Sequence, residues 1–119
     1  MEYELELNAR PFRAIVAGTK KVEGRAQKKK ADDRYERMVG GDVIHFTNNE
    51  TGERVSCEVL FVRKYPNVRI MLESEGTKNV LSSELDVEGG IKSYNSLEGY
   101  EGRIKKFGIY AIGVKPIHE

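Results

Sequence analysis

The odd and even positions of residues 2–7 differ sharply in polarity. Glutamates occupy positions 2, 4 and 6, and Tyr3, Leu5 and Leu7 lie between them. A period of two places the apolar side chains on one face, so this segment predicts a strand with one buried and one solvated side.

Helical spacing follows within a few residues. Pro11 suits the first turn of a helix, and Phe12, Ile15 and Val16 recur at the i, i+3 and i+4 positions that turn one helical face toward a core. Gly18 has the residue type that commonly ends a helix. We therefore expect one short helix that ends at Gly18.

The next segments alternate between extended and irregular patterns. Residues 20–25 return to extended chain, whereas residues 26–40 are polar and lysine-rich and predict an exposed loop, with a short helical turn over 32–38. Gly40-Gly41-Asp42 is a turn signal. Apolar and polar residues then alternate over 43–46, which predicts another strand.

The clearest strand pattern of the chain comes after a polar connection over 47–53. Residues 55–62 alternate with a period of two, so the two strands that flank the connection predict a hairpin. One face of the second strand is expected to carry Val55, Cys57, Val59 and Phe61.

The second half of the chain predicts short helices and one buried strand. Residues 67–75 have amphipathic helical spacing, 76–90 are mixed, and 91–97 favour another short helix. Residues 107–114 are apolar at both parities, as in a central strand that is covered on both faces.

Several short strands, with helices inserted early and in the middle, favour an α+β fold over a doubly wound sheet. We expect a small mixed β-barrel with short helices covering it. A length of 119 residues is enough for one core but not for two, so a single domain over residues 1–119 is expected.

Charge adds a local feature to this picture. The formal net charge is +1, which excludes the global basic field of a histone-like nucleic-acid binder. Between Lys20 and Lys30, however, six cationic residues accompany Glu23 as the one acid. Such a cluster attracts phosphates or an acidic partner, although solvated lysines also occur on loops without any partner.

Several classes of site and location are excluded by composition. Cys57 is the one cysteine, so neither an intramolecular disulfide nor a cysteine-based zinc site is expected, and a reducing, cytoplasmic setting fits best. His45 and His118 lack further ligands at metal-binding spacing, so we expect no metal and no cofactor. No apolar stretch approaches the ~20 residues of a membrane span.

The order of motifs in this chain resembles the ASCH domain family. A short strand and a helix ending at Gly18 precede Lys20-x-x-Glu23-x-Arg25, and Gly41-Asp42-Val43-Ile44-His45-Phe46 follows. The segment from Tyr94 to Gly108, with an apolar final strand, is similar to that family too. The resemblance covers nearly the whole chain.

This resemblance implies a PUA-like fold, in which a β-barrel is covered by helices. It also implies a cleft whose floor includes the Gly-x-Lys-x-x-Glu-x-Arg segment, and a role in binding RNA. The family includes the C-terminal domain of a eukaryotic transcription coactivator, a bacterial ribonuclease, and small amidohydrolases that remove the acetyl group from N4-acetylcytidine. Because one fold carries several functions, the family alone does not give the activity.

The chemistry of the central motif suits an anion or a nucleobase. Arg25 offers a planar fork of donors, and Glu23 accepts hydrogen bonds from an amino group or orients Arg25. Strict alternation places Lys21 on the face of Glu23 and Arg25, whereas the family motif selects Lys20. We expect RNA, or a nucleoside or nucleotide ligand, to contact Lys20, Lys21, Glu23, Arg25, Lys28, Lys29, Lys30 and Tyr65.

Within this set, Lys28, Lys29 and Lys30 are expected on the rim of the cleft. Tyr65, which precedes a proline, is a candidate for stacking on an unpaired base, although an aromatic residue at a strand end is also common as plain packing. A barrel-surface ion pair is the simpler interpretation of Glu23 and Arg25.

Two other classes of function stay open. In the first, an amidohydrolase acting on a modified nucleoside, or a ribonuclease, Lys20 and Glu23 are the catalytic candidates. The resemblance implies a lysine, a threonine and a carboxylate, but Glu23 stands where the threonine is expected, and Glu84, Glu98 and Glu101 are candidates for the carboxylate. In the second, the near-neutral net charge favours a protein-interaction module.

Overall fold

One twisted sheet runs through the protein, whose computed structural model describes residues 1–118. Within that range there are five strands and six short helices. The strands are β1 (Glu2–Leu7), β2 (Val22–Arg25), β3 (Val43–Asn48), β4 (Arg54–Tyr65) and β5 (Ile109–Pro116). The helices are α1 (Ala9–Ala17), α2 (Arg34–Arg37), α3 (Val68–Glu75), α4 (Thr77–Val80), α5 (Val87–Asn95) and α6 (Tyr100–Phe107).

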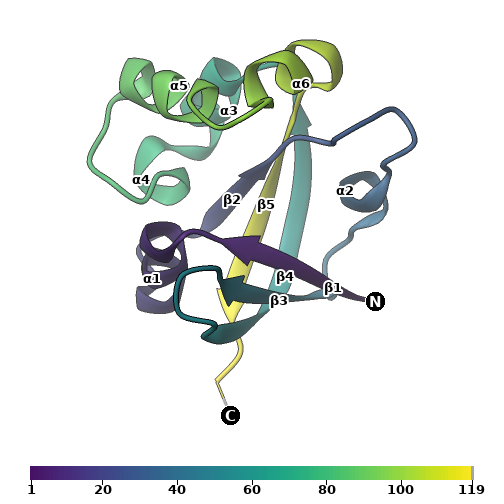
Figure 1. Ribbon diagram of the computed structural model, residues 1–119, viewed down its shortest axis with the longest axis vertical. Coiled ribbons are helices and arrows are strands. Elements are labelled where there is room, and N and C mark those ends of the chain that lie inside the picture. Colours follow the sequence, from purple (N-terminus) through teal and green to yellow (C-terminus); the bar gives the residue numbers. More distant parts are fainter. Residues whose placement is uncertain (119) are drawn as a thin grey trace.

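The strand order is β1-β3-β4-β5-β2, so β1 and β2 are the two edges of the sheet. Strand β1 pairs with β3 in parallel, and the other neighbours are antiparallel. Figure 1 shows that the sheet curls into a half-barrel, which brings the two edges toward each other. The predicted α+β class with a barrel-like sheet and covering helices is confirmed.

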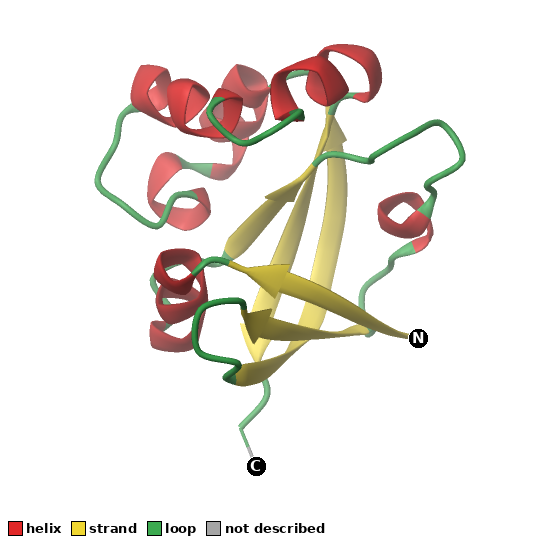
Figure 2. Cartoon of the chain, in the orientation of Figure 1, coloured by secondary structure: helices red, strands yellow, loops and turns green. Residues whose placement is uncertain are grey.

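Each face of the sheet has its own hydrophobic core. The concave side encloses Phe46, Ile44 and Ile15. On the opposite side, helices α3 to α6 gather at one end of the sheet, where Met71 and Leu72 are fully buried (Figure 2). Strand β5 separates the two cores and is buried from Ile109 to Val114. The prediction of a central strand covered on both faces is therefore confirmed.

Local capping explains where two of the helices begin. The side chain of Asn67 accepts a hydrogen bond from the Ile70 amide at 2.9 Å at the start of α3. Asp86 accepts from the Gly89 amide at 2.8 Å at the start of α5. Both residues satisfy an amide that the first helical turn leaves without a partner. Helix α5 thus begins at Val87, earlier than the predicted 91–97.

The hairpin of β3 and β4 is confirmed, but the expected common face of β4 is wrong. A β-bulge shifts the register between Val59 and Phe61, so the alternation slips by one position. Phe61 consequently packs with the helical side of the sheet, while Val62 joins Val59 on the concave side. Leu60, at the bulge, is half exposed.

Two expectations in the first 40 residues are also wrong. Val16 is 47% exposed, because α1 begins at Ala9 and turns Ala9, Phe12 and Ile15 toward the core. The segment 26–40 is not simply an exposed loop, since Tyr35 inserts into the concave core with its ring 5.8 Å from that of Tyr110. One buried aromatic residue is enough to tie a polar segment to the core.

Helices α4 and α6 were not predicted from the sequence. Helix α4 has four residues, too short for a periodic pattern. Helix α6 contains Gly102 and lies between glycines at 99 and 108, which favour turns in a sequence. Packing of Ile104 against the helical core stabilises α6 in spite of this composition.

The two glycines of the α6 region allow a matched test of the backbone. Gly108 has φ +79° and ψ −165°, and an added Cβ would lie 2.5 Å from the Tyr65 carbonyl oxygen. We expect Gly108→Ala to lower the free energy of unfolding by about 2 kcal/mol or more, because only glycine adopts this conformation without strain.

Gly102→Ala is the control for this measurement, since a Cβ at Gly102 would meet no atom within 4 Å. We expect it to leave stability unchanged or to raise it by about 0.5–1 kcal/mol, as glycine-to-alanine changes in helices do. Urea unfolding followed by circular dichroism measures both. Equal effects of the two substitutions would contradict the assignment of strain to Gly108.

Candidate functional site

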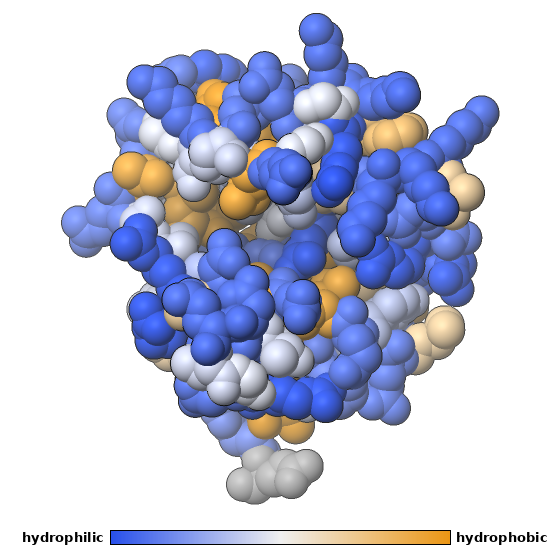
Figure 3. Space-filling view, in the orientation of Figure 1, coloured by the Kyte–Doolittle hydropathy of each residue, from blue (hydrophilic) through white to orange (hydrophobic). Residues whose placement is uncertain are grey.

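A polar pocket of about 500 Å³ lies where the two edges of the half-barrel approach each other. Strand β2 forms its floor, the end of β1 and the start of α1 form one wall, and α4, α5 and α6 contribute the opposite wall. Figure 3 shows the hollow in the middle of the molecular face, between the group of helices and α1. The pocket thus joins segments that are far apart in the sequence.

The turn after α1 decides which lysine enters this pocket. Gly18 has φ +82°, a conformation that favours glycine, and the amides of Thr19 and Lys20 both donate to the Ala14 carbonyl. Regular strand pairing begins only at Val22. Lys20 therefore precedes the alternation of β2 and is buried, while Lys21 is exposed.

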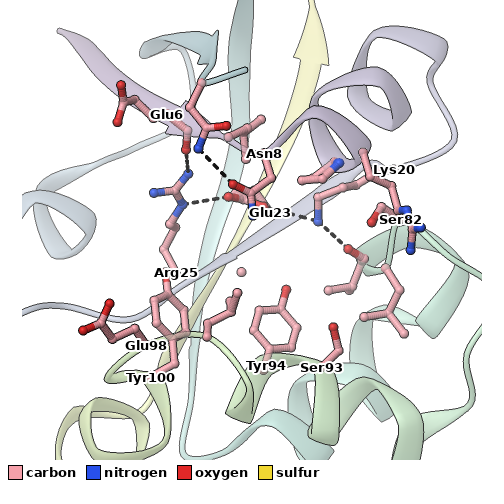
Figure 4. Close-up of a pocket in the computed structure, with 18 residues that line it drawn as sticks. Glu6, Asn8, Lys20, Glu23, Arg25, Ser82, Ser93, Tyr94, Glu98 and Tyr100 are labelled. Carbon is pink, nitrogen blue, oxygen red and sulfur yellow. Dashed lines mark hydrogen bonds and ion pairs between the residues drawn. The ribbon is translucent and has the colours of Figure 1, made fainter. Parts of the chain in front are cut away.

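Three charged side chains converge on the pocket floor (Figure 4). Glu23 receives Arg25 Nε on Oε2 at 2.7 Å, and Lys20 Nζ lies 3.3 Å from its Oε1. Lys20 and Glu23 are only 4% and 6% exposed. Both cations thus share one carboxylate in a place that water hardly reaches. We call this group the Lys20–Glu23–Arg25 triad.

The triad also holds neighbouring elements in place. Lys20 Nζ donates to the carbonyl of Val22 at 2.7 Å and to the carbonyl of Val80 in α4. Arg25 Nη2 donates to the Glu6 carbonyl at 2.6 Å. Because Glu6 belongs to β1 and Arg25 to β2, this bond joins the two edges of the sheet across the opening of the half-barrel.

Burial and charge act against each other on the triad. Burial lowers the pKa of Lys20, and the carboxylate of Glu23 partly restores it. Burial alone would raise the pKa of Glu23, but Arg25 and Lys20 together hold it below its ordinary value. Burial would likewise lower the pKa of Arg25, which the Glu23 carboxylate raises instead. Glu23 is therefore ionised at neutral pH.

An aromatic wall faces the triad across the pocket. Tyr94 is buried and Tyr100 is half-buried, and their rings stack with centroids 6.4 Å apart. Gly24 lies against Tyr94, since a Cβ there would come within 2.3 Å of the hydroxyl oxygen. The glycine between Glu23 and Arg25 thus allows the aromatic wall to approach the floor closely.

Charges around the pocket balance, which affects what it can bind. Its lining includes three acidic residues, Glu6, Glu23 and Glu98, and three cationic residues. The cationic residues are Arg10, Lys20 and Arg25. Such a balanced lining, rich in donors and acceptors, suits a neutral polar ring better than a dense anion.

Of the residues predicted to contact a ligand, the structure brings together Lys20, Glu23 and Arg25 and separates the others from them. Lys21 lines a different hollow beside α4, because it lies on the other side of the chain from Lys20. Lys28, Lys29 and Lys30 line a third hollow against α6, not the rim of this pocket.

Tyr65 also lies outside this pocket. Its ring packs against the helical core, and its hydroxyl donates to Glu75 at 2.5 Å, because the end of β4 runs under α3. The aromatic residues at the pocket are instead Tyr94 and Tyr100. Helix α6, which the sequence pattern does not predict, brings Tyr100 beside Tyr94.

The pocket also distinguishes among the three candidate carboxylates. Glu98 lines it together with Lys20 and Glu23. Glu84 lines the hollow that contains Lys21, and Glu101 lines a shallow hollow beside Pro66. Ser82, Ser93 and Asn8 also border the pocket, and no sequence motif marked them.

A second chain of polar contacts lies on the outer strands. His45 Nδ1 is 2.7 Å from Ser56 Oγ, and His45 Nε2 is 2.5 Å from Glu2 Oε1. His45 pairs directly with Ser56 of β4 and lies diagonally to Glu2, whose register partner on β3 is Val43, and none of the three lines the pocket. We interpret this contact as stabilisation of the sheet.

Neither a metal-binding cluster nor a membrane-spanning helix occurs in the described part of the chain. No group of three or more His, Cys, Asp or Glu residues that would hold a metal ion occurs in residues 1–118. No helix in the same range is long and apolar enough to cross a membrane.

The half-barrel sheet and its covering helices make this a small α+β protein, and the charged triad lies at the floor of its pocket. The sequence model of the ASCH domain matches residues 5–118, and the chain belongs to this family. The predicted family is thereby confirmed. A comparison with curated proteins finds no match for the chain.

Two solved structures resemble the protein over nearly its full length. The crystal structure of the hypothetical protein PH0355 is 36% identical, covers 98% of this chain and 100% of that one, and has a TM-score of 0.82. The solution NMR structure of protein PF0455 from Pyrococcus furiosus is 34% identical, covers both chains completely, and has a TM-score of 0.75.

The triad leads to a stability prediction. Glu23→Gln keeps the shape of the side chain but leaves the buried Lys20 and the partly buried Arg25 without their counter-charge. We expect it to lower the free energy of unfolding by about 3–5 kcal/mol, because breaking a buried ion pair exposes the full desolvation cost of the remaining charges. Glu4→Gln, which removes the exposed pair with Arg54, is the control and should have little effect.

Acid unfolding provides an independent readout of Glu23. The pKa of Glu23 in the folded protein is lower than its ordinary 4.5. The contribution of Glu23 to the free energy of unfolding is therefore complete above pH 4.5 and is lost as the pH falls through the lowered pKa of the folded protein. The wild type should therefore lose stability more steeply than Glu23→Gln below pH 4.5, as measured by urea midpoints at successive pH values. Parallel curves would contradict a buried, ionised Glu23.

Proposed function

We propose that the pocket binds a nucleobase of RNA, or a nucleotide-like ligand, between the triad and the aromatic wall. The observation that carries this proposal is the combination of fixed donors and acceptors with aromatic rings in one pocket of about 500 Å³. Small-molecule sites commonly have volumes of about 300–1,000 Å³, so a nucleoside fits this range. The family resemblance, which implies RNA binding, supports the same class of ligand.

The triad presents hydrogen-bonding groups that are already oriented. Arg25 uses Nε and Nη2 for Glu23 and Glu6, and its Nη1 has no hydrogen-bond partner among residues 1–118. A guanidinium held at two positions offers its remaining donors at low entropic cost to a carbonyl or ring nitrogen of a base. Tyr100 supplies the apolar surface that such a base needs on its ring.

The arrangement of Lys20 fits a binding role better than a role as a catalytic base. An ammonium group has three protons, and three acceptors surround Lys20 Nζ: the carbonyls of Val22 and Val80, and Glu23. A neutral amine would have to point its lone pair at one of these oxygens. We therefore assign Lys20 to positioning of β2 and α4 around the ligand.

Paired variants of Tyr100 test the binding proposal. We expect Tyr100→Leu to weaken binding of fluorescein-labelled octauridylate or octaadenylate by about tenfold or more, since loss of an aromatic contact to a base is worth about 1–3 kcal/mol. Tyr100→Phe, which keeps the ring, should retain most of the affinity. Fluorescence anisotropy measures both, and equal affinities of wild type and Tyr100→Leu would refute the proposal.

A second candidate function, amide hydrolysis on a modified nucleoside, has one observation in its favour. Glu98 lines the same pocket as Lys20 and Glu23, and burial lowers the pKa of Lys20 in the direction that a base requires. The three acceptors around Lys20 oppose this candidate, as described above.

Acetate release separates the two candidates. When the purified protein is incubated with N4-acetylcytidine, we expect no acetate above the no-enzyme control, because Lys20 Nζ is fully engaged by acceptors. Release that Lys20→Met abolishes would establish hydrolysis instead. Circular dichroism of Lys20→Met is needed alongside, to show that loss of activity does not arise from loss of the fold.

A further inference from the structure

The hollow against α6, which is distinct from the pocket, is lined by concentrated positive charge. It has a volume of about 780 Å³ and lies between the loop after β2 and helix α6. Its lining contains no Asp or Glu, and its six cationic residues are Lys28, Lys29, Lys30, Arg103, Lys105 and Lys106. We call it the basic groove.

The cations of the basic groove are not neutralised by the protein. Six of the chain's 20 Lys and Arg residues line it, although the formal net charge is only +1. None of the six forms an ion pair with a residue in the range 1–118. Folding therefore leaves these like charges close together, an arrangement that an external polyanion would stabilise.

The loop that carries the lysines is held in a defined conformation. Gln27 is buried and donates from Nε2 to the Lys29 carbonyl at 3.0 Å. Asp32 accepts from the Lys28 amide at 3.1 Å, and its own amide donates to the Lys29 carbonyl at 3.0 Å. An ordered loop loses little conformational entropy when it binds, so the lysines are better prepared for a ligand than those of a mobile tail.

Both walls of the basic groove continue directly into the pocket. Along the chain after β2, Arg25 lines the pocket and Lys28 lines the groove. Along α6, Tyr100 lines the pocket, and the Arg103 guanidinium lies 5.7 Å from the centre of its ring. Figure 1 shows the loop leaving β2 near α6, so the same two segments line the pocket and the basic groove at successive positions.

The two sites differ in the chemistry that they favour. The pocket has balanced charges and aromatic rings, which suit a neutral base, whereas the groove has only positive charge, which suits phosphates. A single-stranded nucleic acid carries both groups within one nucleotide. A base in a duplex is stacked and paired, so only an unpaired base enters such a pocket without an unstacking cost.

We propose that the basic groove binds the sugar-phosphate backbone of single-stranded RNA, next to the nucleotide whose base occupies the pocket. This inference rests on the proposed function and extends it from a single nucleoside to a polymer. The lysines of the loop and the cations of α6 contact successive phosphates on either side of the strand.

Charge-removal variants on the two walls test the basic groove. One variant combines Lys28→Ala, Lys29→Ala and Lys30→Ala, and the second combines Lys105→Ala with Lys106→Ala. The matched control combines Lys78→Ala, Lys92→Ala and Lys115→Ala, which removes the same charge from exposed positions outside the groove. Circular dichroism of each variant reports on the fold, which we expect to be retained because these side chains are exposed.

Anisotropy with fluorescein-labelled octauridylate, measured as a function of salt concentration, gives the readout. We expect the loop variant to bind about tenfold more weakly at low salt. The slope of log affinity against log salt should fall by about 2, because each phosphate contact on a single strand contributes about 0.7. The α6 variant, which removes two charges instead of three, should show a smaller loss of affinity and a smaller fall in the slope. The control should bind within about twofold of wild type.

The outcomes separate this inference from the proposed function. If both groove variants bind like wild type, or if the control loses as much affinity as the loop variant, the basic groove is not the backbone site. Displacement of the probe by duplex RNA as efficiently as by unlabelled octauridylate would also overturn the inference. If the groove variants lose affinity while Tyr100→Leu does not, phosphate binding by the basic groove is supported and base binding by the pocket is refuted. If Tyr100→Leu loses affinity while the groove variants do not, base binding by the pocket is supported and phosphate binding by the groove is refuted.

Discussion

The shared burial of Glu23 between Lys20 and Arg25 is the interaction on which the arrangement of this protein depends. A half-barrel has two unpaired edges, and here they are β1 and β2. Arg25 reaches from one edge to the Glu6 carbonyl on the other, and Lys20 reaches from the start of β2 to α4. Both cations keep these positions because one carboxylate neutralises them in a site that excludes water. The triad therefore holds the opening of the barrel at a fixed width.

That opening is also the pocket, so under the proposed function the triad would have a structural and a binding role at once. The side chains that join β1, β2 and α4 also line the pocket, where the proposed ligand would meet their hydrogen-bonding groups. Binding sites gain precision when their polar groups are held by other contacts in advance. The aromatic wall faces the same opening, because Gly24 leaves room for Tyr94 close to the pocket floor.

The pocket and the basic groove differ in how their charges are paired. In the pocket Lys20 and Arg25 share the carboxylate of Glu23, whereas the cations of the basic groove form no ion pair within residues 1–118. Paired charges at a dry site give direction to hydrogen bonds, and unpaired charges at a wet site give affinity for phosphates at long range. The near-neutral net charge of the chain conceals this division, because acids on the other surfaces offset the basic groove.

The sequence by itself determined the elements with regular spacing. Alternation in β1, the apolar run of β5 and the order of short strands and helices were sufficient for the α+β class, and the motif from Lys20 to Arg25 was sufficient to find the triad. The strands and helices depend on neighbours in the chain, so local periodicity reports them, whereas Lys20 was selected by the family motif. Alternation failed where a single residue changed the register, as at the bulge beside Leu60 and in the turn before Lys21.

Only the tertiary structure decided which distant groups share a site. It separated Lys28 from the triad, placed Glu98 rather than Glu84 or Glu101 in the lining of the pocket, and placed Tyr100 rather than Tyr65 there. These assignments depend on helices α4 and α6, which are too short or too rich in glycine to be recognised locally and which form because they pack against the sheet. Packing between remote segments, rather than local propensity, therefore determined the pocket and the basic groove.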